Sequence, residues 1–290
     1  MTAPGVSLRT LTDRLRAAGV PSPDHDAAEL VAHVLGVPRS RLTASVVEGM
    51  DGEAREQVER LVERRAGREP LQHLTGVAHF RHLELAVGPG VFVPRPETEV
   101  MTGWVVDAAR ALAADRGSVR VVDLCTGSGA IALSVATEVP QAKVHAVELD
   151  EQACAWARRN VAASPAADRV DLREGDLADA FPELDGTVDI VVSNPPYIPM
   201  AAYDSVAPEA RDHDPALSLW SGDDGLDALR AVVATAARLL VPGGLVAIEH
   251  AEVQGESAPR VLARDGRWRE VRDHPDLTGR QRFVTASRLP

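Results

Sequence analysis

The sequence predicts an α/β protein built around an open, doubly wound sheet and preceded by a small helical domain. Three observations support this fold class. From residue 119 onward, apolar runs of strand length alternate with stretches of helix length. The last two apolar runs, at 267–273 and 281–287, follow one another with no helix between them, which indicates an antiparallel edge. The first 75 residues carry only helical patterns. Such alternation is typical of a mostly parallel sheet covered on both faces.

The pattern of residues 1–75 predicts a small helical domain. Ser7 can cap a helix over 8–18, a second helix is expected over 24–35, and Asp51 can start a third that ends at residue 66. The domain either stabilises its neighbour or recognises a partner, and the pattern alone favours neither role.

Residues 76–93 differ in character from both neighbours. Short apolar alternation is broken there by Gly88-Pro89-Gly90, which predicts a hairpin linker. The third domain, 94–290, opens with a helix that starts near Pro96 and reaches about residue 115. Glu97 and Glu99 either help to close a site or interact favourably with the start of that helix.

After its opening helix, the third domain is predicted to contain seven strands and four further helices, of which the last, after residue 251, is only weakly indicated. Ligands of doubly wound sheets bind at the carboxyl ends of the strands, so the residues that follow each strand are candidate site residues. The predicted strands are 119–124, 143–148, 169–173, 187–193, 244–250, 267–273 and 281–287, and the other predicted helices are 130–139, 151–162 and 225–240.

The composition argues against several classes of protein. The net charge is −12 and lies almost wholly beyond residue 75, which argues against binding to duplex nucleic acid. The chain shows no leader and no apolar run of about 18 residues, so we expect a cytoplasmic protein without membrane contact. Cys125 and Cys154 do not form a metal-type pair, and no metal is expected.

A glycine-rich turn follows the first predicted strand of the sheet. Gly127 and Gly129 allow a tight turn and the close approach of a ligand, and Asp123 can meet a ligand's ammonium group. Glu148 ends the next strand, where a carboxylate can accept two ribose hydroxyls. An ordinary turn and a solvated carboxylate are the alternatives.

The third strand is followed by Asp176, placed to accept the exocyclic amine of an adenine, and by Leu177, placed to pack on its ring. An ordinary turn would give the same residues. Together these features suit a nucleoside with a charged amino-acid tail. They do not separate S-adenosylmethionine from NAD.

The tetrapeptide Asn194-Pro195-Pro196-Tyr197 ends the fourth strand and is the most informative motif. The Asn194 oxygen can accept an N–H, and the prolines fix the backbone so that the Pro195 carbonyl is a second acceptor. Tyr197 can stack on a flat amide or nucleobase. Two acceptors that grip one NH2 group aim its nitrogen at an electrophile, which suits a methyl donor and not a hydride donor. The alternative is an ordinary turn at the end of a strand, with no functional role.

These residues resemble the protein-(glutamine-N5) methyltransferases that modify class I peptide chain release factors, the PrmC/HemK family. The resemblance covers nearly the whole chain, and its most specific motifs are the first two of those that carry it: 68–76, 93–99, 123–129, 193–198 and 243–249. It implies a helical substrate-recognition domain, a β-hairpin linker and a seven-stranded, Rossmann-like class I domain that depends on S-adenosylmethionine. It also implies methylation of the glutamine amide in the Gly-Gly-Gln motif of a release factor.

The resemblance also assigns roles to the candidate residues. The cofactor's methionine part is held by Cys125, Thr126, Gly127, Ser128 and Gly129, and its ribose by Glu148. The glutamine amide is held by Asn194, Pro195, Pro196 and Tyr197, with Asn194 also next to the cofactor. Two residues depart from the family, since Cys125 replaces a glycine and Leu177 replaces an aromatic residue of some members.

Other readings stay open at this point. A DNA adenine-N6 methyltransferase would use the same tetrapeptide on a flipped base, although the acidic sheet domain argues against it. A glutamine of a ribosomal protein is a closer alternative, and a nucleoside-binding scaffold without chemistry is a more distant one. The long stretch 199–222 is expected to shape the substrate channel.

Overall fold

The computed structural model describes residues 7–290 and divides into two compact units. The helical unit comprises the N-terminal part as far as Val77 together with residues 207–213, and the sheet unit comprises residues 78–206 and 214–290. Residues 1–6, which the sequence places in the helical domain, lie outside the described residues.

The helical unit contains the three predicted helices, within one or two residues of their expected bounds. Ser7 caps the first helix by accepting a hydrogen bond from the Thr10 backbone N–H at 3.2 Å. An apolar cluster that includes Leu11, Leu30 and Val58 forms the core. The elements are α1 (Leu8–Ala17), α2 (Pro23–Leu35), the 3₁₀ turn η1 (Arg39–Arg41), α3 (Ala44–Glu48), α4 (Gly52–Ala66), α5 (Leu71–Thr75) and α9 (Pro208–His213).

Helix α9 was not predicted, and ion pairs hold it in the helical unit. Glu209 on α9 accepts hydrogen bonds from Arg65 at 2.9 Å and from Arg68 at 2.7 Å. Arg65 is only 5% exposed and also pairs with Asp26 at 2.7 Å. The stretch 199–222 therefore leaves the sheet unit after Val206 and returns to it at Asp214.

The linker hairpin consists of β1 (Val77–Phe80) and β2 (Leu83–Ala86). It closes at Arg81 and His82, before Gly88–Gly90, and Arg81 adopts a left-handed φ of 53° there. The guanidinium of Arg81 donates to Glu138 at 2.6 Å, which ties the turn to the sheet unit.

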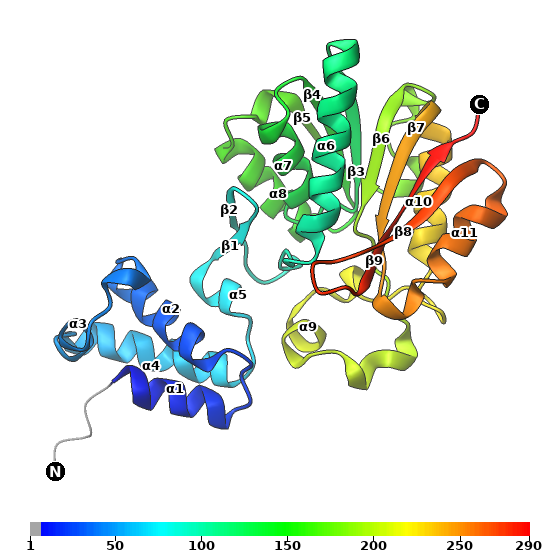
Figure 1. Ribbon diagram of the computed structural model, residues 1–290. Helices are drawn as coiled ribbons and strands as arrows, with labels where there is room; N and C mark the ends of the chain where they lie inside the picture. Colours follow the sequence, from blue (N-terminus) through cyan, green and yellow to red (C-terminus); the bar gives the residue numbers. More distant parts are fainter. Residues whose placement is uncertain (1–6) are drawn as a thin grey trace. The chain divides into compact units, whose positions relative to one another are not determined.

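All seven predicted strands are present in one sheet (Figure 1). The strand order is β5-β4-β3-β6-β7-β9-β8, with parallel pairing from β5 to β7 and antiparallel pairing of β9 with both neighbours. The expected antiparallel edge is thus confirmed. The strands are β3 (Val119–Leu124), β4 (Ala142–Glu148), β5 (Val170–Glu174), β6 (Val188–Ser193), β7 (Leu240–Glu249), β8 (Trp268–Pro275) and β9 (Gln281–Arg288).

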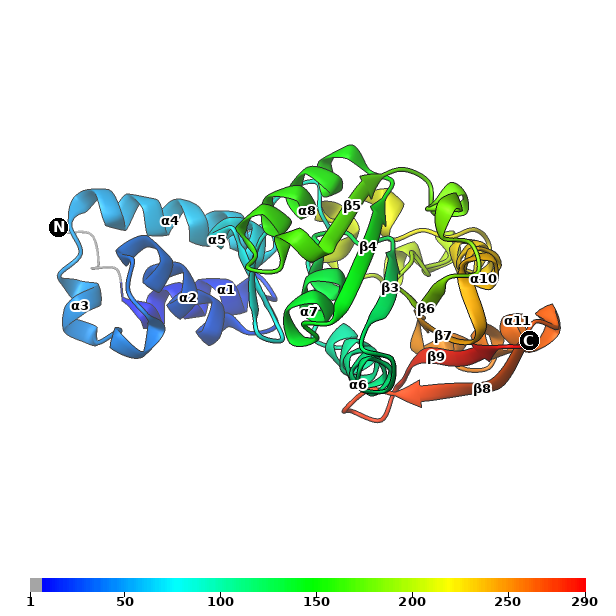
Figure 2. The same ribbon diagram turned by 90° about the horizontal axis from the view of Figure 1, so that it is seen from above.

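Helices cover both faces of this sheet (Figure 2). One face packs against α6 (Thr98–Arg116) and α7 (Ala130–Glu138), and the opposite face packs against α10 (Asp227–Leu239) and α11 (Ser257–Asp265). The remaining helix, α8 (Glu151–Ala163), contacts β4, β5 and β2. Short 3₁₀ turns complete the unit: η2 (Ala167–Arg169), η3 (Leu177–Asp179), η4 (Pro182–Leu184), η5 (Met200–Ser205), η6 (Ala216–Ser218) and η7 (Glu252–Gln254).

Most boundaries in the sheet unit lie within two residues of the prediction, and the start of β7 differs by more. Helix α6 begins at Thr98, two residues after Pro96. Strand β7 begins at Leu240, where Val188 pairs with Leu240 and Ile190 already pairs with Leu245, so the intervening residues form an irregularity. Within residues 7–290, no helix is both long enough and apolar enough to cross a bilayer.

Candidate active site

The parallel strands bring the predicted site residues to one edge of the sheet. Leu124 on β3 pairs with Val147 on β4 and with Ser193 on β6. The residues that follow these partners, Cys125, Glu148 and Asn194, therefore leave the sheet side by side.

Cys125 and the two glycines build the turn after β3 with left-handed backbone angles. The φ angles are 62° at Cys125, 58° at Gly127 and 86° at Gly129. A Cβ at Gly127 would meet no atom within 4 Å, so the space above this residue is open for a ligand. Cys125 adopts a left-handed conformation that favours glycine and disfavours a branched Cβ.

Asp123 lies beneath this turn and organises it. Its Oδ2 accepts hydrogen bonds from the Thr126 hydroxyl at 2.6 Å and from the Ala132 N–H at 3.1 Å. Burial raises the pKa of Asp123 to about 7 in spite of these bonds. Within residues 7–290, Asp123 Oδ1 and Ser128 Oγ are buried and lack a hydrogen-bond partner. Orphaned polar atoms at a glycine turn fit a polar ligand such as an ammonium and carboxylate tail.

The carboxylate of Glu148 is held by backbone N–H groups at the end of β4. Gly127 donates to Oε2 at 2.8 Å and Asp150 donates to Oε1 at 3.0 Å. Burial nevertheless raises the pKa of Glu148. Each carboxylate oxygen has a second lone pair, so these bonds orient the group and leave it able to accept further hydrogens.

Asp176 and Leu177 follow β5 and lie at the rim. Asp176 is exposed and caps the turn η3 by accepting the Ala178 N–H at 2.8 Å. Leu177 is half-buried and packs against the core cluster that includes Phe181. Its side chain can therefore present one edge to a ligand and no flat ring.

The tetrapeptide Asn194-Pro195-Pro196-Tyr197 directly follows β6. The Asn194 Nδ2 donates to the Thr98 hydroxyl oxygen at 3.2 Å. No group among residues 7–290 donates to Asn194 Oδ1 or to the Pro195 carbonyl. Two hydrogen-bond acceptors next to one another are therefore available to a ligand N–H.

Tyr197 is fixed at both ends by residues beyond β7. Its hydroxyl donates to Glu249 Oε1 at 3.3 Å, and its backbone carbonyl accepts from Gln254 Nε2 at 3.0 Å. Burial and the neighbouring Glu249 charge raise the pKa of Tyr197, so the phenol stays protonated. Gly225 has a φ of 74°, and a Cβ there would overlap the Tyr197 carbonyl oxygen.

Sequence reasoning missed four supporting residues: Thr98, Glu249, Gln254 and Asn160. Asn160 on α8 bridges the carbonyls of Ser128 at 2.9 Å and of Ala86 at 3.0 Å, which links the glycine turn to the hairpin. Glu249 lay within a motif that the family resemblance singled out, and Thr98 lay within another. The others are isolated polar residues with no pattern around them.

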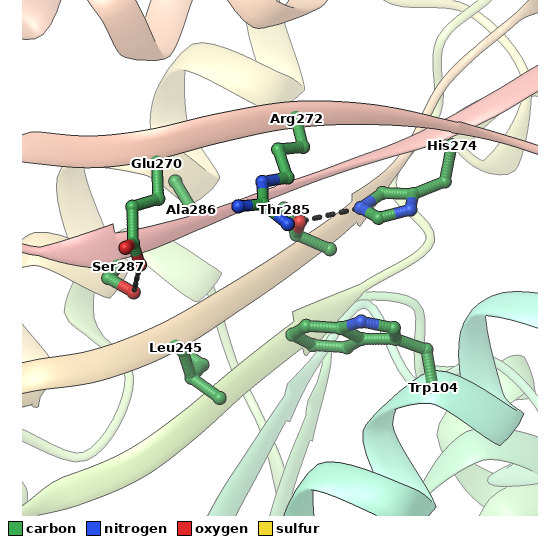
Figure 3. A pocket seen from close by; sticks show the side chains of 8 residues that line it. All are labelled: Trp104, Leu245, Glu270, Arg272, His274, Thr285, Ala286 and Ser287. Carbon is green, nitrogen blue, oxygen red and sulfur yellow. Dashed lines mark hydrogen bonds between the residues drawn. The ribbon is translucent and has the colours of Figure 1, made fainter.

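A separate pocket of about 140 Å³ opens between α6 and the strands β7, β8 and β9 (Figure 3). Trp104 forms one wall, and His274 Nε2 lies 2.7 Å from the Thr285 hydroxyl. The full lining is Trp104, Leu245, Glu270, Arg272, His274, Thr285, Ala286 and Ser287. None of the candidate residues after β3 to β6 is among them, so this pocket is distinct from the candidate site.

Comparisons with known proteins decide the family. Residues 7–76 match the model of the PrmC N-terminal domain, and residues 105–209 match that of the methyltransferase small domain. A release factor glutamine methyltransferase of Streptomyces coelicolor is 57% identical over 275 residues, which cover 95% of this chain and 94% of the relative.

The chain belongs to the release factor glutamine methyltransferase family. A second member, from Mycolicibacterium smegmatis, is 47% identical and covers 100% of this chain and 99% of the relative. The relative from Streptomyces pristinaespiralis that is named 4-amino-L-phenylalanine/4-methylamino-L-phenylalanine methyltransferase is 45% identical over 74% of this chain and 72% of its own length.

Solved structures show the same fold for this methyltransferase. A methyltransferase from Pyrococcus furiosus superposes with a TM-score of 0.51 at 21% identity, covering 72% of this chain and 90% of that one. The catalytic domain of hMettl16 superposes with a TM-score of 0.55 at 13% identity, covering 71% and 75%. The predicted fold class is confirmed, and the enzyme uses S-adenosylmethionine as its methyl donor to methylate release factor glutamine.

Proposed function

We propose that the methyl acceptor is the side-chain N5 of the glutamine in the Gly-Gly-Gln motif of class I release factors. The observation that supports this most directly is the pair of free acceptors, Asn194 Oδ1 and the Pro195 carbonyl. They match the two N–H groups of a primary amide. The full-length relatives named release factor glutamine methyltransferase agree with a glutamine acceptor.

The cofactor contacts belong to the same proposal. Cys125 to Gly129 would hold the methionine part with Asp123 beneath them, and Glu148 would hold the ribose. Asp176 and Leu177 would contact the adenine, where Leu177 offers apolar contact in place of aromatic stacking. Asn194 borders both ligands because it follows Ser193, which pairs with Leu124 immediately before the glycine turn.

The chemistry needs a nucleophilic nitrogen, because the lone pair of an amide is delocalised. The bound donor supplies an electrophilic methyl group. Asn194 and the Pro195 carbonyl accept both N–H bonds, which favours a pyramidal nitrogen and stabilises the positive charge that develops on it. Tyr197 covers the amide plane, and its pinned backbone keeps the nitrogen in line with the methyl group. The excess proton then leaves the methylated nitrogen to solvent.

The proposal also gives a separate role to each region of the chain. We assign substrate recognition to residues 1–75, the linker to 76–93 and methyl transfer to 94–290. The protein acts in the cytoplasm on a protein substrate, with no direct contact to nucleic acid or membrane. The acidic charge of the sheet domain supports this partner choice.

One assay tests the acceptor. The enzyme is incubated with methyl-labelled S-adenosylmethionine and a release factor, with or without a Gln→Ala change in Gly-Gly-Gln. We expect label only in the unaltered factor. Label that persists in the altered factor would refute the glutamine. Free 4-amino-L-phenylalanine serves as the competing acceptor, suggested by the name of the relative that matches over 216 residues, and label in it would favour a small amine substrate.

Asn194→Ala tests the role of the acceptor pair. Loss of one preorganised polar group should lower kcat by at least about 100-fold. The affinity for S-adenosylmethionine, measured by calorimetry, should stay within a few-fold because Glu148 and the glycine turn remain. A variant with full turnover would exclude the proposed grip.

A further inference from the structure

Gln254 lies in the turn after β7, and its side chain reaches the tetrapeptide of the proposed acceptor site. It is only 3% exposed. Its Nε2 donates hydrogen bonds to the backbone carbonyl of Tyr197 at 3.0 Å and to that of Asp224 at 3.2 Å. Its Oε1 accepts a hydrogen bond from the Ala251 N–H at 2.9 Å. One buried side chain therefore joins three segments of the chain, which lie after β6, before α10 and after β7.

The three partners fix which way the Gln254 amide points. A backbone N–H can only donate and a backbone carbonyl can only accept, so Oε1 must face Ala251 and Nε2 must face the two carbonyls. This task needs a donor and an acceptor at the same end of one side chain. A carboxylate in the same place would present only oxygen atoms to the carbonyls of Tyr197 and Asp224.

Ala251 is itself fixed to the antiparallel edge of the sheet. Its carbonyl oxygen accepts a hydrogen bond from the Gln254 backbone N–H at 2.8 Å and lies 2.9 Å from His250 Nδ1. His250 Nε2 lies 3.0 Å from Asp273 Oδ1 on β8, and the His250 backbone N–H donates to the Arg282 carbonyl on β9 at 2.9 Å. Gln254 is thus anchored, through Ala251 and His250, to the strands β8 and β9.

The tetrapeptide is held at both ends in this arrangement. At its start, Ser193 pairs with residues of β3 and β7. At its end, the Tyr197 carbonyl is bound by Gln254, and a Cβ at Gly225 would overlap both of these groups. The two prolines between the ends have fixed φ angles, so little backbone freedom remains. The Pro195 carbonyl therefore lies on a short, stiff segment with two anchors.

We propose that Gln254 is a positioning residue for methyl transfer, because it fixes the far end of the tetrapeptide to the sheet. It thereby holds the Pro195 carbonyl and the Tyr197 ring in the geometry that the reaction requires. This rests on the proposed function, in which these two groups bind the acceptor amide. Gln254 acts through Tyr197. A small displacement of groups that orient the reacting atoms is costly in rate, so the loss of Gln254 affects kcat.

Gln254→Ala is the central variant, with Gln281→Ala as its control. Gln281 undergoes the same chemical change, but it is exposed at the start of β9. We expect Gln254→Ala to lower kcat on the order of 10-fold. The affinity for S-adenosylmethionine, measured by calorimetry, should stay within a few-fold because Glu148 and the glycine turn are unaltered. Gln281→Ala should match the wild type. Wild-type kcat in Gln254→Ala would overturn the proposal.

Gln254→Glu gives a readout in pH that a merely space-filling role would not move. The protonated carboxyl group donates one O–H and accepts through its other oxygen, much as the amide does, whereas the ionised group can only accept. Burial favours the protonated form, so the ratio of the variant's kcat to that of the wild type should fall at least about 5-fold from pH 6 to pH 9. A ratio that does not change with pH would overturn the proposal.

The charged groups around Gln254 are common to both proteins, so their own titration cancels in this ratio. They belong to the three joined segments and to the ion-pair partners of those segments: Asp224, Arg230, Glu249, His250, Glu252, Asp273 and Arg280.

Hydrogen exchange tests the anchor without any transfer assay. In Gln254→Ala, the backbone N–H groups of residues 197–206 should exchange about 10-fold faster than in the wild type, because the segment opens more often. Residues 119–124 on β3 should exchange at the wild-type rate. Unchanged exchange over 197–206 would overturn the proposal. A wild type that fails to label the release factor would instead contradict the proposed acceptor alone.

Discussion

At the scale of single residues, Cys125 shows how a departure from the family pattern is accommodated. It keeps a left-handed φ of 62°, where a side chain with an unbranched Cβ is strained by on the order of 1 kcal/mol. Burial also raises the pKa of its thiol, which disfavours the nucleophilic thiolate.

Two substitutions at Cys125 separate backbone strain from side-chain contacts. Cys125→Gly should lie within about 1 kcal/mol of the wild type in unfolding free energy and retain activity, because relief of strain offsets the added chain entropy. Cys125→Val should lose more than about 2 kcal/mol, since a branched Cβ tolerates this region poorly. Urea denaturation measures both, and equal losses in the two variants would rule out strain.

The charge on Glu249 should appear in the pH dependence of stability. Burial raises the pKa of Glu249 from 4.5 to about 7, while the nearby Thr98 hydroxyl, the charge of Arg282 and the Tyr197 hydroxyl lower it and the charge of Glu97 raises it further. Between pH 4.5 and about pH 7, Glu249 is therefore protonated in the folded protein and ionised in the unfolded chain. Stability contributed by this group falls as pH rises through that window.

Glu249→Gln should remove this loss of stability at high pH, because glutamine does not ionise. Relative to the wild type, the variant should gain on the order of 1–3 kcal/mol between pH 5 and pH 8. Asp123, whose pKa is also raised to about 7 by burial, is present in both proteins and cancels in the comparison. Urea unfolding at the two pH values measures the gain, and a difference that does not change with pH would contradict it.

At the scale of elements, the central strands β3 and β6 could be predicted because each is a nearly continuous apolar run buried on both faces. The outer strands β5 and β8 are more exposed, and their place in the alternating pattern indicated them. Strand β7 started earlier than expected because Pro242-Gly243-Gly244 interrupts its apolar run, and only pairing with β6 shows that Leu240 already belongs to the sheet. The sequence does not show which strands are neighbours. It therefore could not predict that Asn194 and Glu249 directly follow paired residues of β6 and β7. The residues at the strand ends were predictable since doubly wound sheets place ligands there.

The turn before α10 is a further element on which the site depends. Gly225 and Gly243 both have positive φ angles, 74° and 80°, so alanine brings similar backbone strain at each. Only at Gly225 would the new Cβ meet the Tyr197 carbonyl, whereas nothing lies within 4 Å at Gly243. We expect Gly225→Ala to lose more stability than Gly243→Ala, because its new Cβ overlaps backbone, and Gly225→Ala alone to lose at least about 10-fold in kcat at temperatures where both variants are folded. Equal kcat in both would refute a role for this contact.

At the scale of the whole molecule, α9 could not be predicted because its six residues bury no side chain. It is held by partners more than a hundred positions away in the sequence, Arg65 and Arg68. Burial opposes ionisation of Glu209, but hydrogen bonds from Arg68 and Arg65 lower its pKa to about 2. These ion pairs therefore persist well into the acidic range, and their stabilisation is lost only as pH falls through that value.

Glu209→Ala should release this segment. The change leaves the buried guanidinium of Arg65 with one partner fewer. We therefore expect faster proteolysis within residues 199–222. We also expect the KM for release factor to rise about 5-fold, which corresponds to a loss of about 1 kcal/mol in binding free energy. The affinity for S-adenosylmethionine should not change. Asp212→Ala, on the same helix but paired with its neighbour Arg211, is the matched control. Protease resistance equal to that of the control would exclude an anchoring role.

The membership of residues 207–213 in the helical unit also bears on how the chain can be divided. A fragment ending at Val77 would lack Glu209, and a fragment starting at Ala78 would carry Glu209 without Arg65 and Arg68. The two halves are therefore not independent modules in the sequence. If two relatives recombined at the hairpin, the ion pairs would be kept only where one parent supplied both arginines and the other supplied the glutamate. Arg65, Arg68 and Glu209 are therefore expected to be inherited together.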